Sequence, residues 1–132
     1  MKLYLDENLS PRFRTCFDSN RFEVFTFQFM GWQGKKNGEL LLLLQQEKFR
    51  GLITADQLMY SDEQLRRSGL HFFLVRSASD ALPDRLSLMN RLNSFLLEHD
   101  EKLRQATASK SIVTDGIVSP DLPAGAHLVW IR

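Results

Sequence analysis

The sequence has a single cysteine, few glycines and prolines, and no long hydrophobic run. Cys16 cannot form an intramolecular disulfide bond, which excludes a disulfide-stabilised scaffold and favours a cytoplasmic protein. The longest apolar run, Leu40–Leu44, is far too short to span a bilayer, and no apolar segment of signal-peptide length follows Met1. These absences predict a soluble protein that does not act in a membrane.

The chain also lacks an excess of charge of either sign. Lys and Arg number 17 against 16 Asp and Glu, so the formal net charge is +1. A protein that coats nucleic acid through charge alone is therefore excluded, whereas a local basic groove is not. The 132 residues, 43% of them hydrophobic and 25% charged, are typical of one globular domain with a real core.

Short apolar runs alternate with helical patterns along the chain. We expect strands at Lys2–Leu5, Phe22–Phe27, Gly51–Thr54 and Leu70–Val75, and helices beginning at Ser10-Pro11, Asn37, Met59 and Pro83-Asp84 and ending near Phe17, Lys48, Arg67 and Arg104. This order predicts an α/β fold, a three-layer sandwich with a mainly parallel central sheet and helices on both faces.

Residues 105–132 predict a looser C-terminal extension of the same domain. Gln105–Ser111 is polar and built of small residues, and we interpret it as a linker. The dipeptide Asp115-Gly116 between two apolar pairs predicts a hairpin, and Leu128–Ile131 predicts a final strand.

Three acidic residues stand where a strand gives way to a helix or turn. Asp6 follows the first strand, Asp56 follows Gly51–Thr54, and Glu39 opens the helix that contains Leu40–Leu44. Each has a structural alternative, because Asp6 and Asp56 suit caps or turns and Glu39 favours the positive end of a helix dipole. If the strands are parallel neighbours, however, Asp6 and Asp56 leave the sheet at its ligand-binding edge.

Carboxylates gathered without basic partners repel one another, and a divalent cation relieves that repulsion. Mg²⁺ or Mn²⁺ prefers oxygen ligands of this kind, polarises a phosphoryl oxygen and lowers the pKa of bound water. Asn8 and Thr54 are expected to orient the carboxylates or metal-bound waters. The pattern therefore predicts a metal site at Asp6, Glu39 and Asp56, with phosphodiester hydrolysis as its chemistry.

Three segments also resemble the short bacterial PIN-like proteins, relatives of the PIN-domain ribonucleases that include VapC toxins. They are Leu5–Arg12 (Leu-Asp-Glu-Asn-Leu-Ser-Pro-Arg), Gly34–Leu41 (Gly-Lys-Lys-Asn-Gly-Glu-Leu-Leu) and Leu52–Asp56 (Leu-Ile-Thr-Ala-Asp), in order within residues 1–76. The resemblance implies a PIN-like sandwich with metal-binding acids at strand ends, and Mg²⁺- or Mn²⁺-dependent cleavage of RNA. It also implies a toxin role beside an antitoxin-like protein partner.

One position departs from the family pattern. Many relatives carry another acid two positions after the third, where this chain has Leu58. Asp62 or Asp80 could replace it from nearby loops. A site with three acids could hold one metal ion and lose the second, so a weak or inactive PIN-like module that binds RNA or a protein partner is the competing hypothesis.

A basic and aromatic segment precedes the helix that contains Glu39. Trp32, with Lys35 and Lys36, could stack on bases and contact phosphates. The alternative is that Trp32 and the neighbouring Phe27 and Phe29 close the core under a long loop. Farther along, the Leu and Met stripe of the helix Asp84–Arg104 is a candidate for a homodimer or partner surface as well as for the core.

Overall fold

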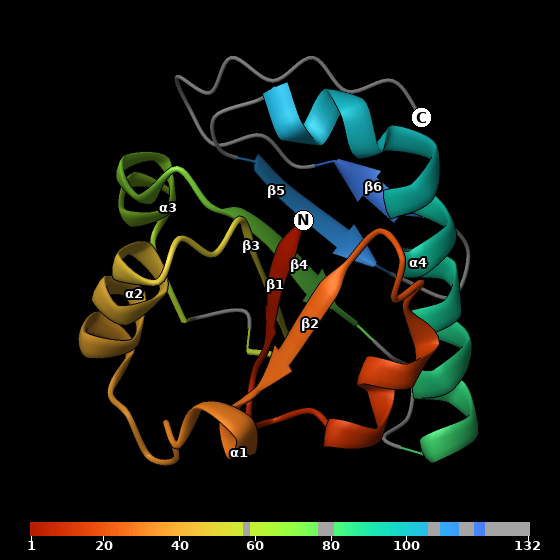
Figure 1. Cartoon of the computed structure of the whole chain (residues 1–132), viewed down its shortest axis with the longest axis horizontal. Coiled ribbons are helices and arrows are strands. Elements are labelled where there is room, and N and C mark those ends of the chain that lie inside the picture. Colours follow the sequence, from red (N-terminus) through yellow and green to blue (C-terminus); the bar gives the residue numbers. More distant parts are fainter. Residues whose placement is uncertain (57–58, 77–80, 106–108, 114–117, 121–132) are drawn as a thin grey trace.

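The computed structural model places six strands in one sheet between two groups of helices (Figure 1). It describes residues 1–56, 59–76, 81–105, 109–113 and 118–120. The elements in chain order are β1 (Lys2–Leu5), the 3-10 helix η1 (Pro11–Cys16), β2 (Glu23–Thr26), α1 (Phe27–Met30), α2 (Asn37–Gln46), β3 (Gly51–Thr54), α3 (Asp62–Ser68), β4 (His71–Val75), α4 (Leu82–Gln105), β5 (Ser109–Val113) and β6 (Val118–Pro120). The α/β class expected from the sequence is confirmed.

The sheet order brings the ends of three strands to one edge. Its order is β2-β1-β3-β4-β5-β6, with parallel pairing from β2 through β5 and antiparallel pairing between β5 and β6. Leu5 of β1 lies opposite Thr26 of β2 on one side and Ile53 of β3 on the other. The first and third expected strands are therefore parallel neighbours, which is the condition under which Asp6 and Asp56 leave the sheet at the same edge.

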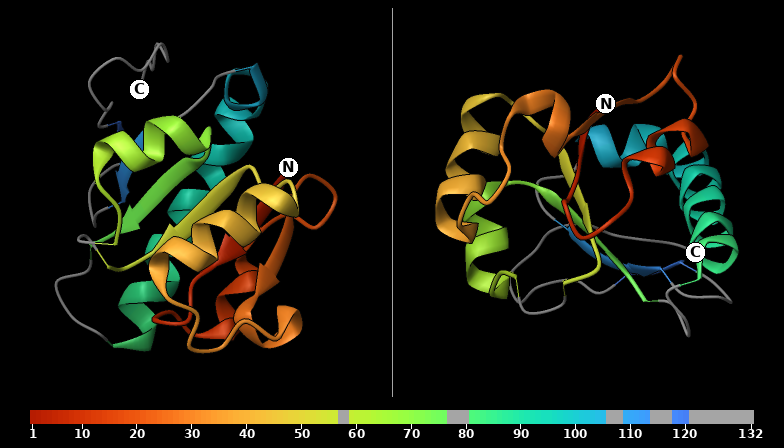
Figure 2. Two further views of the ribbon diagram at one scale, coloured as in Figure 1. Left: turned by 90° about the vertical axis from the view of Figure 1, so that its left-hand side faces the viewer. Right: turned by 90° about the horizontal axis from the view of Figure 1, so that it is seen from below.

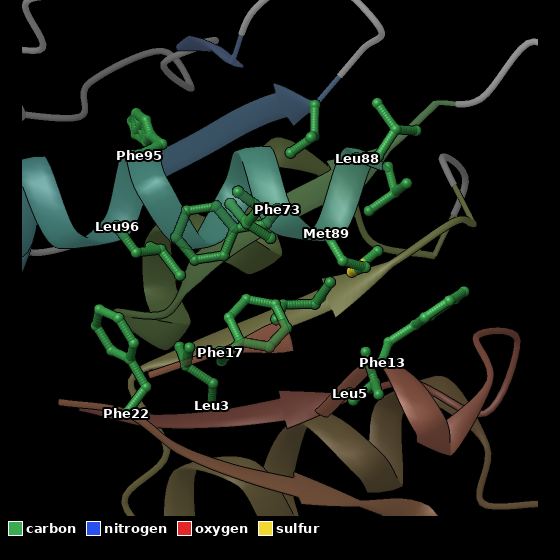
Figure 3. Close-up of a cluster of buried hydrophobic side chains, with 14 of the residues drawn as sticks. Leu3, Leu5, Phe13, Phe17, Phe22, Phe73, Leu88, Met89, Phe95 and Leu96 are labelled. Carbon is green, nitrogen blue, oxygen red and sulfur yellow. The ribbon is translucent and has the colours of Figure 1, made fainter. Parts of the chain in front are cut away.

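Helices cover both faces of this sheet. Figure 2 shows α2 and α3 on one side and α4 with η1 on the other. Because neighbouring side chains of a strand point to opposite faces, Leu3 and Leu5 pack toward α4, while Tyr4 packs toward α2. Figure 3 shows the core under α4, to which that helix contributes Leu88, Met89 and other residues of its apolar stripe. The central strands are thus buried on both sides, as parallel sheets usually are.

Gly51 allows β3 to lie close to both of its neighbours. A Cβ atom at this position would stand 2.7 Å from Leu3 Cδ2, 3.1 Å from Phe73 Cε2 and 3.3 Å from the carbonyl oxygen of His71. A side chain here would force Leu3 to move and would crowd Phe73 and the backbone of His71. Close packing between the strands therefore favours glycine at this position.

The start of η1 agrees with the sequence prediction, whereas the starts of α3 and α2 differ from it in detail. Ser10 caps η1, its Oγ accepting a hydrogen bond from the Arg12 amide, and Pro11 follows it, as predicted. Helix α3 begins at Asp62 and not at the predicted Met59, because Ser61 caps it with a capping box. Helix α2 begins at Asn37, but the expectation that the Asn37 side chain caps this helix is wrong, because Lys36 is the cap residue and Asn37 Nδ2 donates to the Met59 carbonyl oxygen at 3.1 Å.

The interpretation of Gln105–Ser111 as a linker is wrong at both ends. Gln105 ends α4, and Ser109–Ser111 belong to β5, which pairs in parallel with β4. The predicted hairpin is confirmed as the antiparallel β5–β6 pair. Its Asp115-Gly116 turn, the expected strand Leu128–Ile131, and Gln57, Leu58 and Asp80 lie outside the described residues. Within the described part of the chain, no helix combines the length and apolar character needed to cross a membrane.

A buried histidine of β4 is the partner of Ser109, a polar residue at the start of β5. His71 of β4 is fully buried, with Nε2 2.7 Å from the Leu103 carbonyl oxygen and Nδ1 2.7 Å from Ser109 Oγ. A carbonyl oxygen can only accept, so Nε2 carries the proton and Nδ1 accepts from the serine hydroxyl. This chain of hydrogen bonds joins β4, β5 and the end of α4.

Candidate functional site

Asp6 is the buried acid at the carboxyl edge of the sheet. Its amide donates to the Ile53 carbonyl oxygen at 2.9 Å, and its own carbonyl oxygen accepts from the Leu9 amide at 3.0 Å. The first bond continues the pairing of β1 with β3, and the second closes the turn that leads to η1. Together they fix the backbone of Asp6, whose residue surface is 6% exposed.

Thr54, the last residue of β3, orients the Asp6 carboxylate. Its Oγ1 donates to Asp6 Oδ2 at 2.8 Å and accepts from the Asp56 amide at 3.1 Å. Thr54 is fully buried, so this hydroxyl has a fixed set of partners. The side chain therefore couples the buried acid of β1 to the turn that carries Asp56.

Asn8 ties the turn after β1 to the turn after β3. Its Nδ2 donates to Thr54 Oγ1 at 3.1 Å, and its Oδ1 accepts from the Ala55 amide at 3.1 Å. The sequence predicted that Asn8 and Thr54 orient the carboxylates. In the structure Thr54 hydrogen-bonds with the Asp6 carboxylate and the Asp56 amide, and Asn8 hydrogen-bonds with Thr54 and Ala55. The amide of Asn8 holds the two strand ends at a set separation.

The pKa of Asp6 lies above its ordinary value, chiefly because burial disfavours the charged carboxylate. The hydrogen bond from Thr54 and a backbone hydrogen bond from Glu7 act in the opposite direction, and the negative charges of Glu7 and Asp56 raise the pKa again. Asp56 is exposed, so its carboxylate reaches solvent at the edge where Asp6 is buried. The charge of Asp56 thus contributes to the raised pKa of Asp6, by less than burial does.

Two residues that the sequence did not single out belong to this neighbourhood. Glu7 follows Asp6 directly, and its Oε2 accepts from the Gly34 amide at 3.3 Å. Tyr60 is buried, its hydroxyl donates to the Asn37 carbonyl oxygen at 2.8 Å, and its pKa is raised by burial and by the charge of Asp6. The pair Asp6-Glu7 was visible in the sequence, whereas nothing in the pattern around Tyr60 indicated its position.

Glu39 stands apart from the two aspartates in its contacts. It is exposed in the first turn of α2, and its Oε1 forms an ion pair with Lys35 Nζ at 2.9 Å. The hydrogen bonds of Asn37 with Met59 and Tyr60 fasten the start of α2 to the loop after β3. Among the described residues, no three His, Cys, Asp or Glu side chains form a group that could hold a metal ion.

The aromatic residues before α2 divide into packed and exposed members. Trp32 is half-buried, with ring centroids 5.5 Å from Tyr4 and 5.8 Å from Phe49. Phe29 of α1 is 71% exposed. Lys36 is exposed immediately before α2, while Lys35 is engaged with Glu39. The contacts of Trp32 agree with the core-closing alternative for this residue.

The oxygen atoms at this edge fit one hard divalent cation. Magnesium in proteins is commonly held by one or two carboxylates and retains several water molecules. Asp6 and Asp56 supply two carboxylates beside the orienting groups of Thr54 and Asn8. Two carboxylates are a donor set that suits Mg²⁺ or Mn²⁺, and Glu39, which is paired with Lys35, is not part of it.

Comparison of this chain with protein-family models, with curated proteins and with solved structures found no match.

Proposed function

We propose that this chain is a PIN-like, metal-dependent ribonuclease in which Asp6 and Asp56 hold Mg²⁺ or Mn²⁺ at the carboxyl edge of the sheet. One observation carries the proposal: Thr54 positions the carboxylate of Asp6, a residue that is 6% exposed, and the pKa of Asp6 is raised chiefly by burial and to a smaller extent by the charges of Glu7 and Asp56. Such repulsion is costly without a cation. The order of the motifs around Asp6, Glu39 and Asp56 supports the PIN-like assignment.

When bound, the ion supplies a polarised phosphoryl oxygen and a water of lowered pKa. The chain contributes the geometry for that chemistry. Thr54 holds Oδ2 of Asp6, and Asn8 accepts a hydrogen bond from the amide of Ala55, the residue before Asp56. Asp6 and Asp56 would hold the ion, and these two contacts would keep their backbone positions fixed. Glu39 joins this site when its exposed ion pair with Lys35 opens, a change that costs little because exposed ion pairs contribute about 0–1 kcal/mol.

RNA is the substrate that the surroundings of this site favour. Lys36 is exposed next to α2, and Lys35 becomes free to contact a phosphate whenever Glu39 turns toward the metal. Exchange of the Lys35–Glu39 pair for two new contacts would couple RNA binding to assembly of the site. Trp32 precedes both lysines in the same loop and is half-buried, so the part of it that remains exposed is a further candidate for contact with RNA. In the toxin role that the sequence resemblance implies, an antitoxin-like protein would cover this surface.

A second candidate function is a PIN-like module that binds RNA or a protein partner without cleaving RNA. The ion pair between Glu39 and Lys35 favours it, since that pair withholds the third acid from the two aspartates. Both functions would use the surface around Asp6, Asp56 and the lysines before α2, and they differ in whether bound RNA is cleaved.

Cleavage of a labelled single-stranded RNA by the full chain tests the proposal. We expect cleavage with Mg²⁺ or Mn²⁺, none with a chelator, and loss of cleavage in Asp6→Asn and Asp56→Asn. Glu47→Gln is the matched control, because it removes an exposed carboxylate just past the last residue of α2 and should retain activity. Cleavage without a metal ion, or full activity of the Asp6→Asn variant, would contradict the proposal of a metal-dependent ribonuclease. RNA binding without turnover in the wild type would favour the second function.

A further inference from the structure

Strand β2 is an open edge of the sheet. It is the terminal strand in the sheet order and pairs with β1 and with no other described strand. The Glu23 amide donates inward to the Met1 carbonyl oxygen at 2.9 Å, so the backbone groups of the next residue, Val24, point away from the sheet. An unpaired edge of this kind is a template for another strand.

A groove of about 570 Å³ accompanies this edge. It is lined by Arg14 and Thr15 of η1, by Phe17 and Ser19 of the loop that follows, and by Phe22–Phe25 at the start of β2 and within it. The phenylalanines give the groove an apolar wall, and Val24 and Phe25 are half-buried. An added strand would therefore gain apolar contacts as well as backbone hydrogen bonds.

The groove also carries one charge of each sign. Arg14 and Glu23 both line it, and both are exposed. Under a two-fold axis beside an edge strand, if residue i of one copy contacts residue j of the other, then residue j of the first also contacts residue i of the second. Arg14 of one copy can therefore meet Glu23 of the other, and the reverse pair forms at the same time. A peptide of one charge sign would be attracted by one of these residues and repelled by the other.

Phe29 supplies a second, independent indication. At 71% it is the most exposed of the large hydrophobic residues in the described part of the chain. It belongs to α1, which follows β2 directly, and its ring centroid is 5.4 Å from that of Phe25 in the strand. The apolar residues of α4 that suggested a dimer surface in the sequence, such as Met89 and Leu92, are buried in the core. Leu82 and Leu97 of α4 are each 39% exposed and Leu42 of α2 is 54% exposed, so the most exposed large apolar residue of the described part of the chain lies beside the edge of β2.

We propose that the edge of β2 is a self-association surface, at which a second copy of this chain pairs its own β2 in antiparallel fashion. In this dimer Arg14 of each copy faces Glu23 of the other, and each Phe29 is covered at an end of the seam. The two sheets then form one continuous sheet. The carboxyl edge that carries Asp6 and Asp56 remains outside the paired backbone.

Sedimentation of the full chain over a concentration series tests the proposal, without metal or RNA. We expect a reversible transition from 15.3 kDa to twice that mass. Arg14→Glu and Glu23→Arg should each move the transition to about tenfold higher concentration, because each replaces two attractive contacts with repulsive ones. The double variant Arg14→Glu/Glu23→Arg should restore the wild-type transition.

Two controls separate the interface from general effects. Arg12→Glu changes the same charge on η1 at an exposed residue outside the groove and should leave the transition unchanged. Phe29→Asp should weaken association, whereas Leu42→Asp, at a 54% exposed residue of α2, should not. Circular dichroism confirms that each variant is folded. A wild type that stays monomeric throughout, a dimer indifferent to both Phe29→Asp and Arg14→Glu, or a double variant that fails to recover would each overturn the proposal.

Discussion

Replacement of Thr54 by valine removes the hydroxyl that organises the candidate site. Valine has nearly the shape of threonine, so the fully buried position keeps its packing. The change deletes the donor to Asp6 Oδ2 and the acceptor that the amides of Asn8 and Asp56 share. Asn8 is exposed and can turn to water, whereas the Asp6 carboxylate is buried. The loss should therefore fall mainly on Asp6.

The magnitude follows from the three contacts. A hydrogen bond to a charged acceptor contributes about 1.5–3 kcal/mol, and removing the acceptor of a partly buried amide costs about 1 kcal/mol more. The buried methyl group of valine returns up to about 0.8 kcal/mol. The net destabilisation of Thr54→Val at neutral pH is then about 2–3 kcal/mol, which lowers the melting temperature of a chain of this size by about 10 °C.

Urea unfolding at neutral and acidic pH measures this prediction. Because the Thr54 hydrogen bond lowers the pKa of Asp6, its removal should raise that pKa further, and the penalty should shrink once Asp6 is protonated. Thr15→Val is the matched control, since Thr15 is exposed and its Oγ1 donates to the Arg12 carbonyl oxygen on the surface. A penalty below about 0.5 kcal/mol at neutral pH, within the range of ordinary surface substitutions, would refute the reasoning, as would an equal penalty at both pH values.

Three further predictions concern stability in the absence of metal. The pKa of Asp6 is raised in the folded state, so its ionisation costs stability at neutral pH; Asp6→Asn should raise the melting temperature there, and the gain should vanish as pH falls through that pKa. Burial lowers the pKa of His71 from 6.5 to about 4, so about 3 kcal/mol of stability should be lost as pH falls from 6.5 towards 4; an NMR titration midpoint near 6.5 would contradict this. Gly51→Ala should destabilise the chain by about 1–3 kcal/mol in urea unfolding, and an unchanged midpoint would show that β1 and β4 can yield.

The parallel core of the fold could be predicted from the sequence, whereas β5 could not. The apolar runs of β1, β3 and β4 are typical of strands buried on both faces. In β5, Ser109 and Ser111 are buried. A serine in a sequence does not by itself indicate burial, because its hydrogen-bond partner in the fold is not known from the sequence. The partner of Ser109 is His71, 38 residues earlier, so the pattern of Ser109–Val113 suggested a linker.

The candidate site shows the same division between local and distant information. Adjacent parallel strands of similar register were enough to predict that Asp6 and Asp56 leave at one edge. Glu39 follows Lys35 by four residues, a spacing that permits an ion pair. The sequence could not show whether Glu39 would pair with Lys35 or lie with Asp6 and Asp56. Nor could it show that Trp32 packs on Tyr4 while Phe29 faces solvent, because that choice depends on how the loop crosses the sheet edge.

Calorimetric titration of the full chain with Mn²⁺ tests the central claim most directly, because it requires no knowledge of the RNA. We predict binding by the wild type and by Glu47→Gln, with affinity that falls as pH drops through the raised pKa of Asp6, and loss of binding in Asp6→Asn and Asp56→Asn. A wild type that binds no Mn²⁺ at neutral pH, or an Asp6→Asn variant that binds as the wild type does, would contradict the account of a metal centre at this edge.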